Sequence, residues 1–258
     1  MGTCIDHDRK PKSIVDETLY RKFFEVEKRH WWFVARSRIV LDLIQHRLRI
    51  PAGAAVLDIG CGTGAILQSL SRRYNATGLD QSPLAIDLCH QQGIKNALLG
   101  GFEVLPDPQQ RFDLITLLDV IEHLDDDLGL LQSCHDRLSP GGMVLVTVPA
   151  WPSLWSKHDD LNHHRRRYRR GPLRDVLERA GFEVPWISYY NSVLFPLALA
   201  HRLLERLRPD RPDRALEIPS SGFNRLLTSL FTAERCWLRV GRFPAGLSLM
   251  AVGGKPVG

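Results

Sequence analysis

The feature of the sequence with the clearest chemical meaning is a glycine-rich turn behind a short apolar run. Residues 56–59 form the run, residues 60–64 hold three glycines, and a helical pattern starts at Ala65. Glycines let a backbone turn tightly and come close to a ligand, and the first turn of a helix offers free N–H groups. Asp80 ends the next apolar run, where a carboxylate accepts both hydroxyls of a ribose. The pattern predicts a loop that binds a nucleoside cofactor.

Two cofactors compete for this loop. Gly60, Gly62 and Ala65 satisfy the G-x-G-x-x-G/A pattern of dinucleotide-binding proteins. Asp58, Gly60, Gly62 and Gly64 instead resemble the S-adenosylmethionine (SAM) loop of class I methyltransferases. A carboxylate two residues before the first glycine repels a pyrophosphate but suits a ligand with an ammonium and a sulfonium group, so Asp58 favours SAM. An NAD(P)-linked oxidoreductase and a Rossmann-like binding protein without catalysis are the alternatives.

Three later segments strengthen the resemblance to class I methyltransferases. Residues 112–124, 138–146 and 181–184 resemble the fourth strand, the entry to the fifth strand and the sixth strand of that family. The likeness covers residues 54–190 and the last strand, and is greatest to ubiquinone-type and related small-molecule methyltransferases. It implies a Rossmann-like α/β fold with SAM as the cofactor. The sheet would have seven mostly parallel strands, an antiparallel last strand and helices on both faces.

The resemblance assigns roles to residues by their position. It places Gly60 and Gly62 under the methionyl part of SAM, with Asp58 near the amino group of the cofactor. Asp80 holds the ribose, and Gln81 flanks the adenine. The remaining contacts implied for this part of the site come from Gly64, Leu118 and Asp119.

One position departs from the family pattern. The family often has Gly-Asp-Ala after the third strand, where the Asp binds the adenine amino group, but this chain has Gly101 at that position. We therefore expect the backbone or ring of Phe102 to hold the adenine, although Gly101 mildly favours a protein without catalysis. In the N-terminal helical segment, Arg36 or Arg38 is expected to pair with the SAM carboxylate or an acidic substrate. The alternative is an aromatic helix face that only packs on the sheet.

The methyl acceptor is expected beside residues 150–170, because ligands of open α/β sheets bind outside the carboxyl ends of the strands. Methyl transfer from a sulfonium is an in-line displacement, and an oxygen or nitrogen nucleophile usually has to lose a proton, which suits histidine. His158 is the first choice for this base, oriented by Asp159, with His163 or His164 as rivals. The alternatives are histidines that only form hydrogen bonds, or a metal site of these four residues. Their spacing is not diagnostic, so no metal is predicted.

Apolar periodicity divides the chain into three parts. Residues 1–53 are predicted to form an N-terminal helical lid, with helical sequence over 17–50. Residues 54–190 and 243–258 form the SAM-binding domain, and residues 191–242 are a helical insertion with a loop at 208–213. The predicted strands are 55–59, 76–79, 96–99, 112–118, 143–148, 182–190 and 247–252, and the helices between them are 64–73, 82–92, 125–138 and 171–180.

Charge is distributed unevenly over these parts. Residues 1–53 carry 11 Lys/Arg and 7 Asp/Glu, residues 54–150 carry 5 and 12, and residues 151–258 carry 18 and 10. An acidic middle argues against a uniformly basic nucleic-acid binder, and the arginine cluster at 165–170 is weak evidence for one. The basic flanks point to an anionic acceptor or surface.

The amphipathic helices of the insertion are expected to pack as a lid or a dimer face, with an anionic membrane surface as the alternative. Five scattered cysteines are typical of the reducing cytoplasm. Together these observations predict a cytoplasmic SAM-dependent methyltransferase, in contact with the membrane from one side if that alternative holds. It would act on a small-molecule or lipid-linked acceptor, at oxygen.

Overall fold

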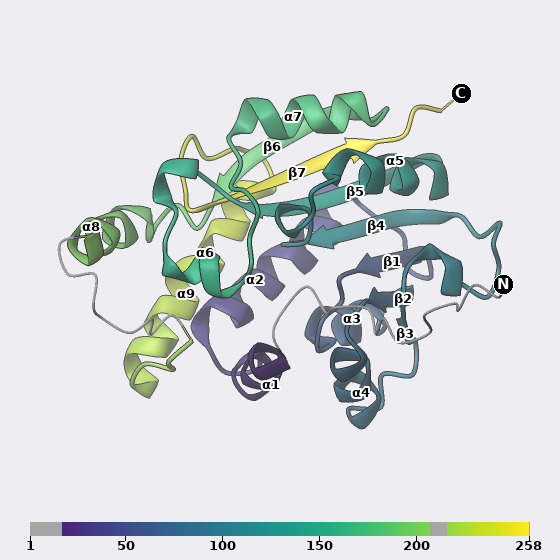
Figure 1. Ribbon diagram of the computed structural model, residues 1–258. Coiled ribbons are helices and arrows are strands. Elements are labelled where there is room, and N and C mark those ends of the chain that lie inside the picture. The colour runs from purple at the N-terminus through teal and green to yellow at the C-terminus, as the bar shows by residue number, and fades with distance from the viewer. Residues whose placement is uncertain (1–16, 207–215, 258) are drawn as a thin grey trace, which may run out of the picture.

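A single seven-stranded sheet forms the centre of the computed structural model, which describes residues 17–206 and 216–257 (Figure 1). The strands are β1 (Ala55–Ile59), β2 (Asn75–Asp80), β3 (Ala97–Leu99), β4 (Phe112–Leu118), β5 (Leu138–Pro149), β6 (Glu183–Tyr190) and β7 (Ser248–Gly254). Their order across the sheet is β3-β2-β1-β4-β5-β7-β6. Neighbours from β3 to β5 are parallel, and β7 is antiparallel to both β5 and β6. The Rossmann-like fold with an antiparallel last strand is confirmed.

Most strand residues are apolar on both sides of the sheet. Helices cover both faces and bury these residues. On one face lie α5 (Asp127–Arg137) and α7 (Arg170–Arg179). On the other lie α2 (Trp31–Asp42), α3 (Ala65–Leu70), α4 (Pro83–Gln91) and α9 (Ser221–Leu238). The parallel strands all end on the side where α1 (Glu17–Val26) and α6 (Lys157–Leu161) cross the edge of the sheet (Figure 1).

The predicted helical segment 17–50 is interrupted, which corrects the expectation of continuous helical sequence. Helix α1 ends at Val26, a turn occupies residues 27–30, and α2 begins at Trp31. His30 caps α2, because its Nδ1 accepts a hydrogen bond of 3.3 Å from the backbone N–H of Trp32. A short π-helical stretch, Leu43–Arg47, follows α2. The turn matters because it directs Glu27 toward the glycine loop.

The helical insertion packs on the N-terminal helices. Helix α8 (Phe195–Arg206) precedes α9, and the loop predicted at 208–213 lies outside the described residues. The Asn224 side chain accepts a hydrogen bond of 3.0 Å from Trp31 N and donates one of 2.8 Å to Arg29 O. At the other end of α9, Arg239 pairs with Asp42 of α2. Helices α2 and α9 therefore form one layer below the sheet.

The strands were predicted closely because a buried parallel strand is a compact apolar run with turn residues around it. The largest difference is the start of β5, predicted at residue 143 and found at Leu138. Leu138 pairs with Phe112 of β4 before a register shift, and the pairing resumes at Met143. In the described part of the chain, none of the helices combines the length and the apolar character needed to cross a bilayer.

Candidate functional site

A large cavity of about 2260 Å³ follows the carboxyl ends of β1, β2, β4 and β5. Its walls come from the glycine loop, the strand ends, the lid helices α1 and α2, the segment between β5 and α7, and helices α8 and α9. Common small-molecule sites measure roughly 300–1,000 Å³. This cavity therefore has room for a nucleoside cofactor and a second ligand together.

Gly60 and Gly64 each require glycine for two reasons: a positive φ, and a neighbouring side chain too close for a Cβ. Gly60 has a φ of +71°, and a Cβ there would lie 2.5 Å from a methyl carbon of Val120. Gly64 has a φ of +88°, and a Cβ there would lie 2.6 Å from Ile94 and 2.8 Å from Cys89 Sγ. Gly60 and Gly62 line the cavity, whereas Gly64 does not. Gly64 instead lets the start of α3 pack closely on Cys89 of α4, and its contact with the cofactor stays a prediction.

Two carboxylates organise the floor of the cavity beside this loop. Asp58 lies opposite Thr116 in the β1–β4 register, and its Oδ1 accepts a hydrogen bond of 2.6 Å from Thr116 Oγ1. Burial raises the pKa of Asp58 to about 6. Asp80 accepts hydrogen bonds of 2.9 Å from both Gly62 N and Ser82 N. Asp80 thus joins the end of β2 to the glycine loop at the place predicted for the ribose.

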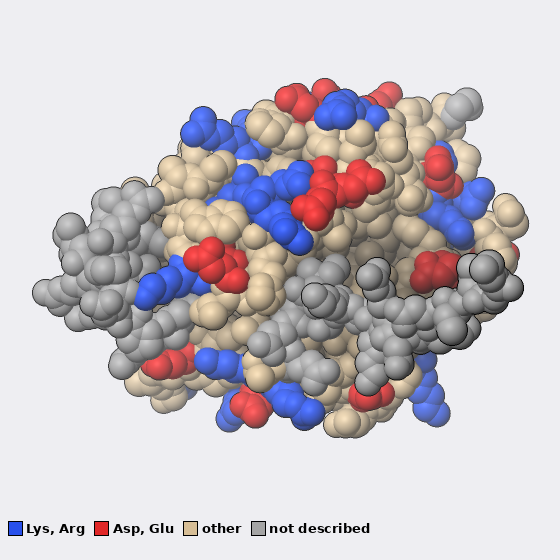
Figure 2. All heavy atoms as spheres, in the orientation of Figure 1, with Lys and Arg blue, Asp and Glu red and all other residues tan. Residues whose placement is uncertain are grey.

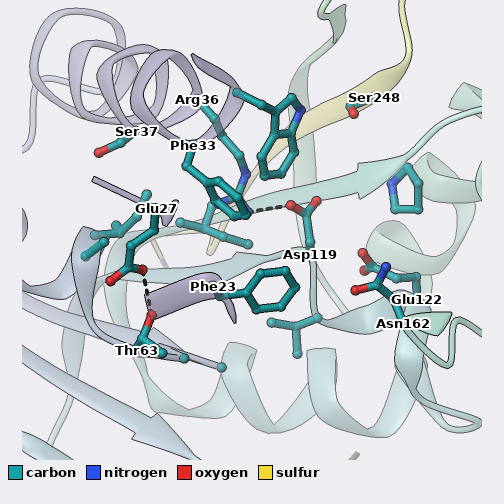
Figure 3. Close-up of a pocket in the computed structure, with 18 of the residues that line it drawn as sticks. Phe23, Glu27, Phe33, Arg36, Ser37, Thr63, Asp119, Glu122, Asn162 and Ser248 are labelled. Carbon is teal, nitrogen blue, oxygen red and sulfur yellow. Dashed lines mark hydrogen bonds and ion pairs between the residues drawn. The ribbon is translucent and has the colours of Figure 1, made fainter. Parts of the chain in front are cut away.

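The lid contacts this floor at Asp80 and at Asp119. Tyr20 Oη of α1 donates to Asp80 Oδ1 over 3.3 Å. Arg36 of α2 pairs with Asp119 at 2.6 Å, at the end of β4 (Figure 3). Thr147 Oγ1 donates to Asp119 Oδ1 over 3.1 Å, and the Arg36 guanidinium lies 5.1 Å from the centre of the Trp32 ring. Arg36, predicted to meet the cofactor carboxylate, is thus already held in the cavity wall by Asp119.

The residues expected around the adenine, and Leu118, expected to close the other side of the cofactor, also line the cavity. Those around the adenine are Gln81, Gly101 and Phe102. Phe102 begins a short 3-10 turn after β3, and the Arg137 guanidinium lies 5.5 Å from the centre of its ring. One face of this ring is therefore covered by a cation.

A buried aspartate fixes the segment beyond β5. Asp159 Oδ1 accepts hydrogen bonds of 2.7 Å from Arg167 Nε and 2.9 Å from His164 Nδ1. Its Oδ2 accepts two more, from Ser156 N at 2.8 Å and Ser156 Oγ at 3.0 Å. Burial alone would raise the pKa of Asp159, but the hydrogen bonds from His164 and Arg167 bring it below its usual range.

The structure brings Asp159 together with His164, whereas sequence reasoning paired it with His158. The Ser156 capping box turns the Asp159 side chain into the protein, away from the cavity wall. His158 and His164 both line the cavity, from α6 and from the loop after it. His163 is exposed, with a φ of +55°, and is not part of the cavity wall. The structure therefore does not bring His163 together with His158 and His164 at the cavity wall.

Sequence reasoning missed Glu122, which lies beside His164 at the cavity wall. Glu122 is fully buried, and neither carboxylate oxygen has a hydrogen-bond partner within the described residues. Burial, and then the nearby charge of Asp119, raise its pKa well above its ordinary value. Burial lowers the pKa of His123 to about 4, and the His123 and His164 rings meet edge to face with centres 4.7 Å apart. From the sequence, residues 119–124 were used only for their resemblance to the turn after the fourth strand of the family. The burial of Glu122, which makes it a candidate site residue, cannot be read from the sequence.

Metal-ligating atoms do gather at this point. One atom each from Glu122, His123 and His164 lies within 4.8 Å of the others. This set shares only His164 with the four residues weighed from the sequence. Two imidazoles and a carboxylate are donors that divalent ions accept.

Three of the five arginines in the cluster at 165–170 pair with acidic side chains. Arg166 pairs with Asp127 at 3.0 Å, and Arg165 with Asp125 at 3.7 Å. Together with Arg167 they tie this segment to α5 and to Asp159. Figure 2 shows basic and acidic side chains side by side on this face of the molecule. The pairing leaves little of the unbroken positive field that nucleic-acid binding requires.

The comparisons with known proteins agree with this geometry. A family model described as a methyltransferase domain matches residues 32–185. A probable S-adenosylmethionine-dependent methyltransferase from Mycolicibacterium smegmatis is 30% identical over 192 residues, which cover 69% of this chain and 70% of the relative. A ubiquinone biosynthesis O-methyltransferase from Pseudomonas aeruginosa is 32% identical over 104 residues, covering 38% of this chain and 45% of the relative. The chain therefore matches about half of the length of that relative.

Solved structures share the fold at low identity. A chain of the Haloferax volcanii complex between the Trm112 methyltransferase activator and a methyltransferase has a TM-score of 0.59 and 20% identity, with 93% of this chain and 95% of that chain covered. Phosphoethanolamine N-methyltransferase 2 from Haemonchus contortus, solved with S-adenosyl-L-methionine, has a TM-score of 0.53 and 18% identity. The match covers 92% of this chain and 60% of that chain.

Proposed function

The chain belongs to the methyltransferase domain family and uses SAM as its cofactor, and from this premise we propose that it methylates an oxygen atom of a small, lipid-like acceptor. Membership removes the alternative of an NAD(P)-linked oxidoreductase. Oxygen is supported by the ubiquinone biosynthesis O-methyltransferases among its relatives. The observation that carries the proposal is the hydrogen bond between His164 and the buried Asp159, at the cavity wall next to Glu122.

This pair has the arrangement required of a general base. An acceptor hydroxyl becomes a good nucleophile as its proton leaves, and a histidine held by a carboxylate takes such a proton. When His164 Nδ1–H donates to Asp159, the lone pair of the neutral ring lies on Nε2. Within the described residues, Nε2 of His164 has no hydrogen-bond partner. We therefore assign the base to His164 in preference to His158.

The reaction then balances without any further reagent. The acceptor oxygen attacks the methyl carbon of SAM in line with the carbon–sulfur bond, and that bond's electron pair stays on sulfur. The proton of the hydroxyl moves to His164, and S-adenosylhomocysteine leaves as the neutral thioether. The protein's contribution is alignment and the exclusion of water, to which the lid contacts of Tyr20 and Arg36 add.

The apolar end of the cavity supports a lipid-like acceptor. Five apolar residues line this end of the cavity: Leu194 just before α8, Leu197 and Ala198 in α8, and Phe223 and Leu227 in α9. Leu197 is 62% exposed and Phe223 48%, so this lining continues to the surface. An apolar wall that joins a polar reaction centre to the surface fits an acceptor with a reactive head and an apolar tail. The exposed apolar side chains around it are Val193, Leu226 and Leu230.

We propose that this apolar surface meets a membrane from the cytoplasmic side, where a lipid-like acceptor would be found. The test is sedimentation with vesicles of anionic and of neutral phospholipid at low salt. Binding to the anionic vesicles that weakens with salt is expected. An absence of binding to either vesicle would contradict membrane contact, and a concentration-dependent dimer that covers this face would replace it.

The acceptor assignment is tested with labelled SAM and matched pairs of phenol and catechol probes. Each pair has the same ring with and without an isoprenoid tail. We expect an O-methyl ether, identified by mass spectrometry, and a lower KM for the tailed member of a pair. Methylation only at nitrogen or carbon of a wider probe set would contradict O-methylation, and equal KM values would contradict the apolar subsite.

A further inference from the structure

Glu27 is a buried acidic residue of the N-terminal segment, and it was assigned no role from the sequence. It lies in the turn between α1 and α2, is only 8% exposed, and lines the cavity. Its Oε2 accepts a hydrogen bond of 2.5 Å from Thr63 Oγ1 of the glycine loop (Figure 3). Its Oε1 is buried and has no hydrogen-bond partner within the described residues. One oxygen is therefore fixed by the glycine loop, and the other lacks a donor.

A buried carboxylate oxygen without a donor is costly, and a positively charged donor satisfies it best. Lys28 follows directly in the chain, but its Nζ donates to Gln92 Oε1, and Gln92 Nε2 donates to Thr63 O over 3.0 Å. The Lys28 ammonium is thus hydrogen-bonded to Gln92, which itself binds Thr63. Burial raises the pKa of Glu27 to about 7. Lys28 is near enough for its charge to lower this pKa in part, but within the described residues no group donates a hydrogen bond to Oε1.

The cofactor carries a cation of suitable size. The methionyl end of SAM has an α-ammonium and an α-carboxylate on the same carbon, so it needs a negative and a positive partner close together. The lid presents both signs to the cavity, with Glu27 over Thr63 and Arg36 over Asp119 (Figure 3). Gly60 and Gly62, predicted to lie under the methionyl part, line the same cavity.

We propose that Glu27 binds the α-ammonium group of SAM through Oε1, while Arg36 takes the α-carboxylate. The inference rests on SAM as the cofactor. Thr63 holds the Glu27 carboxylate in place from below, so the lid recognises both charges of the amino-acid end. Asp58, which the family resemblance places near the amino group, is held by Thr116 in the floor of the cavity. Glu27 then supplies the contact from the lid side.

Calorimetric titration with two thioethers tests the proposal. One ligand is S-adenosylhomocysteine (SAH), and the other is its deamino analogue, which keeps the carboxylate and lacks the ammonium group. The wild-type protein is expected to bind SAH about 10- to 100-fold more tightly than the analogue, the range of a hydrogen bond between charged groups. In Glu27→Gln this ratio should fall to within about threefold, because SAH affinity drops and affinity for the analogue does not.

Glu25→Gln is the matched control, since Glu25 lies two residues earlier, in the last turn of α1, carries the same charge and is exposed. It should leave the ratio unchanged. A Glu27→Gln variant that binds both ligands equally more weakly would show a structural role and overturn the proposal. A wild-type ratio near one would overturn it without any variant. Failure of wild-type protein to bind SAH at all would contradict the cofactor itself.

Discussion

The two halves of the cavity are built in different ways. On the cofactor side, the glycine loop and Asp80 follow one another in the chain, and the Asp80 carboxylate accepts a hydrogen bond from Gly62 N. On the acceptor side, Glu122 follows β4, the Asp159–His164 pair follows β5, and the apolar wall comes from α8 and α9. The centre of the first half lies within residues 58–80, and the second half is assembled by the fold from distant segments.

This difference implies a division of labour. The cofactor half offers backbone groups and carboxylates that suit a ligand common to a whole family. The acceptor half offers side chains from loops and helices that vary independently of the sheet. Changes on the acceptor side should therefore alter the reaction and leave cofactor affinity in place, and changes on the cofactor side should do the reverse.

The largest effect is expected from His164→Gln. Loss of the general base should lower the methyl-transfer rate by roughly 10²–10⁴-fold at saturating SAM. The rate is measured with labelled SAM and the tailed catechol probe. His163→Gln is the control, because His163 is the neighbouring, exposed histidine. A His164→Gln enzyme with wild-type rate would return His158 to the position of first candidate.

Asp80→Ala should be the strongest change on the cofactor side. It removes the expected ribose contacts and the anchor of Gly62, so SAH affinity should fall by about 100-fold, the equivalent of about 3 kcal/mol. Tyr20→Phe removes only the lid hydrogen bond to Asp80 and should cost far less. Unchanged SAH affinity in Asp80→Ala would refute the ribose assignment.

Asp159→Asn should lower the stability of the segment on the acceptor side. Asparagine leaves the buried Arg167 without its anionic partner, so we expect unfolding free energy to fall by about 3 kcal/mol in urea titrations at neutral pH. The pKa of Asp159 is lower in the folded protein than in the unfolded chain. Its contribution is therefore present above about pH 4 and is lost as pH falls through the folded pKa.

The difference in urea midpoint between wild type and Asp159→Asn should accordingly shrink as the pH is lowered below about 4. Asp125→Asn serves as the control, because the Asp125 side chain is 81% exposed and its pair with Arg165 spans 3.7 Å. If both variants lose the same free energy of unfolding, the buried position of Asp159 does not make its ion pair more stabilising than the exposed pair of Asp125.

The smallest effect is expected at the apolar wall. Phe223→Ser should raise the KM for a tailed probe by about 10-fold, because it removes part of the apolar surface that would cover the tail. The KM for the untailed partner should stay the same. Val240→Ser, at a position that is 80% exposed and outside the cavity wall, should change neither value. An equal rise for both probes would place the tail elsewhere.

The sequence predicted most of the fold and much of the cofactor half. Local patterns determine strands such as Phe112–Leu118, because a buried strand is a short apolar run in the sequence. Gly64 shares the motif, but its requirement for glycine also comes from close contact with Ile94 and with Cys89 of α4, which the motif does not reveal. The contacts of the cofactor residues stay a prediction that ligand titrations test.

The acceptor half was harder to predict from the sequence, because residues that are neighbours in the chain need not be in contact in the structure. His158 and Asp159 are neighbours in sequence, but the capping box at Ser156 directs the aspartate toward His164 and Arg167. The sequence around Glu122 does not indicate that the side chain is buried. It becomes buried only because the end of β4 packs against the loop that contains His164. The break before His30, which directs Glu27 to Thr63, likewise depends on packing between helices.

The division of labour is tested most directly by the affinity of the His164→Gln variant for SAH. Calorimetric titration is performed on this variant and on Asp80→Ala under the same conditions. We predict that His164→Gln binds SAH with wild-type affinity, while Asp80→Ala binds it about 100-fold more weakly. A loss of SAH affinity in His164→Gln comparable to that in Asp80→Ala would contradict the account, because the two halves would then act as one site.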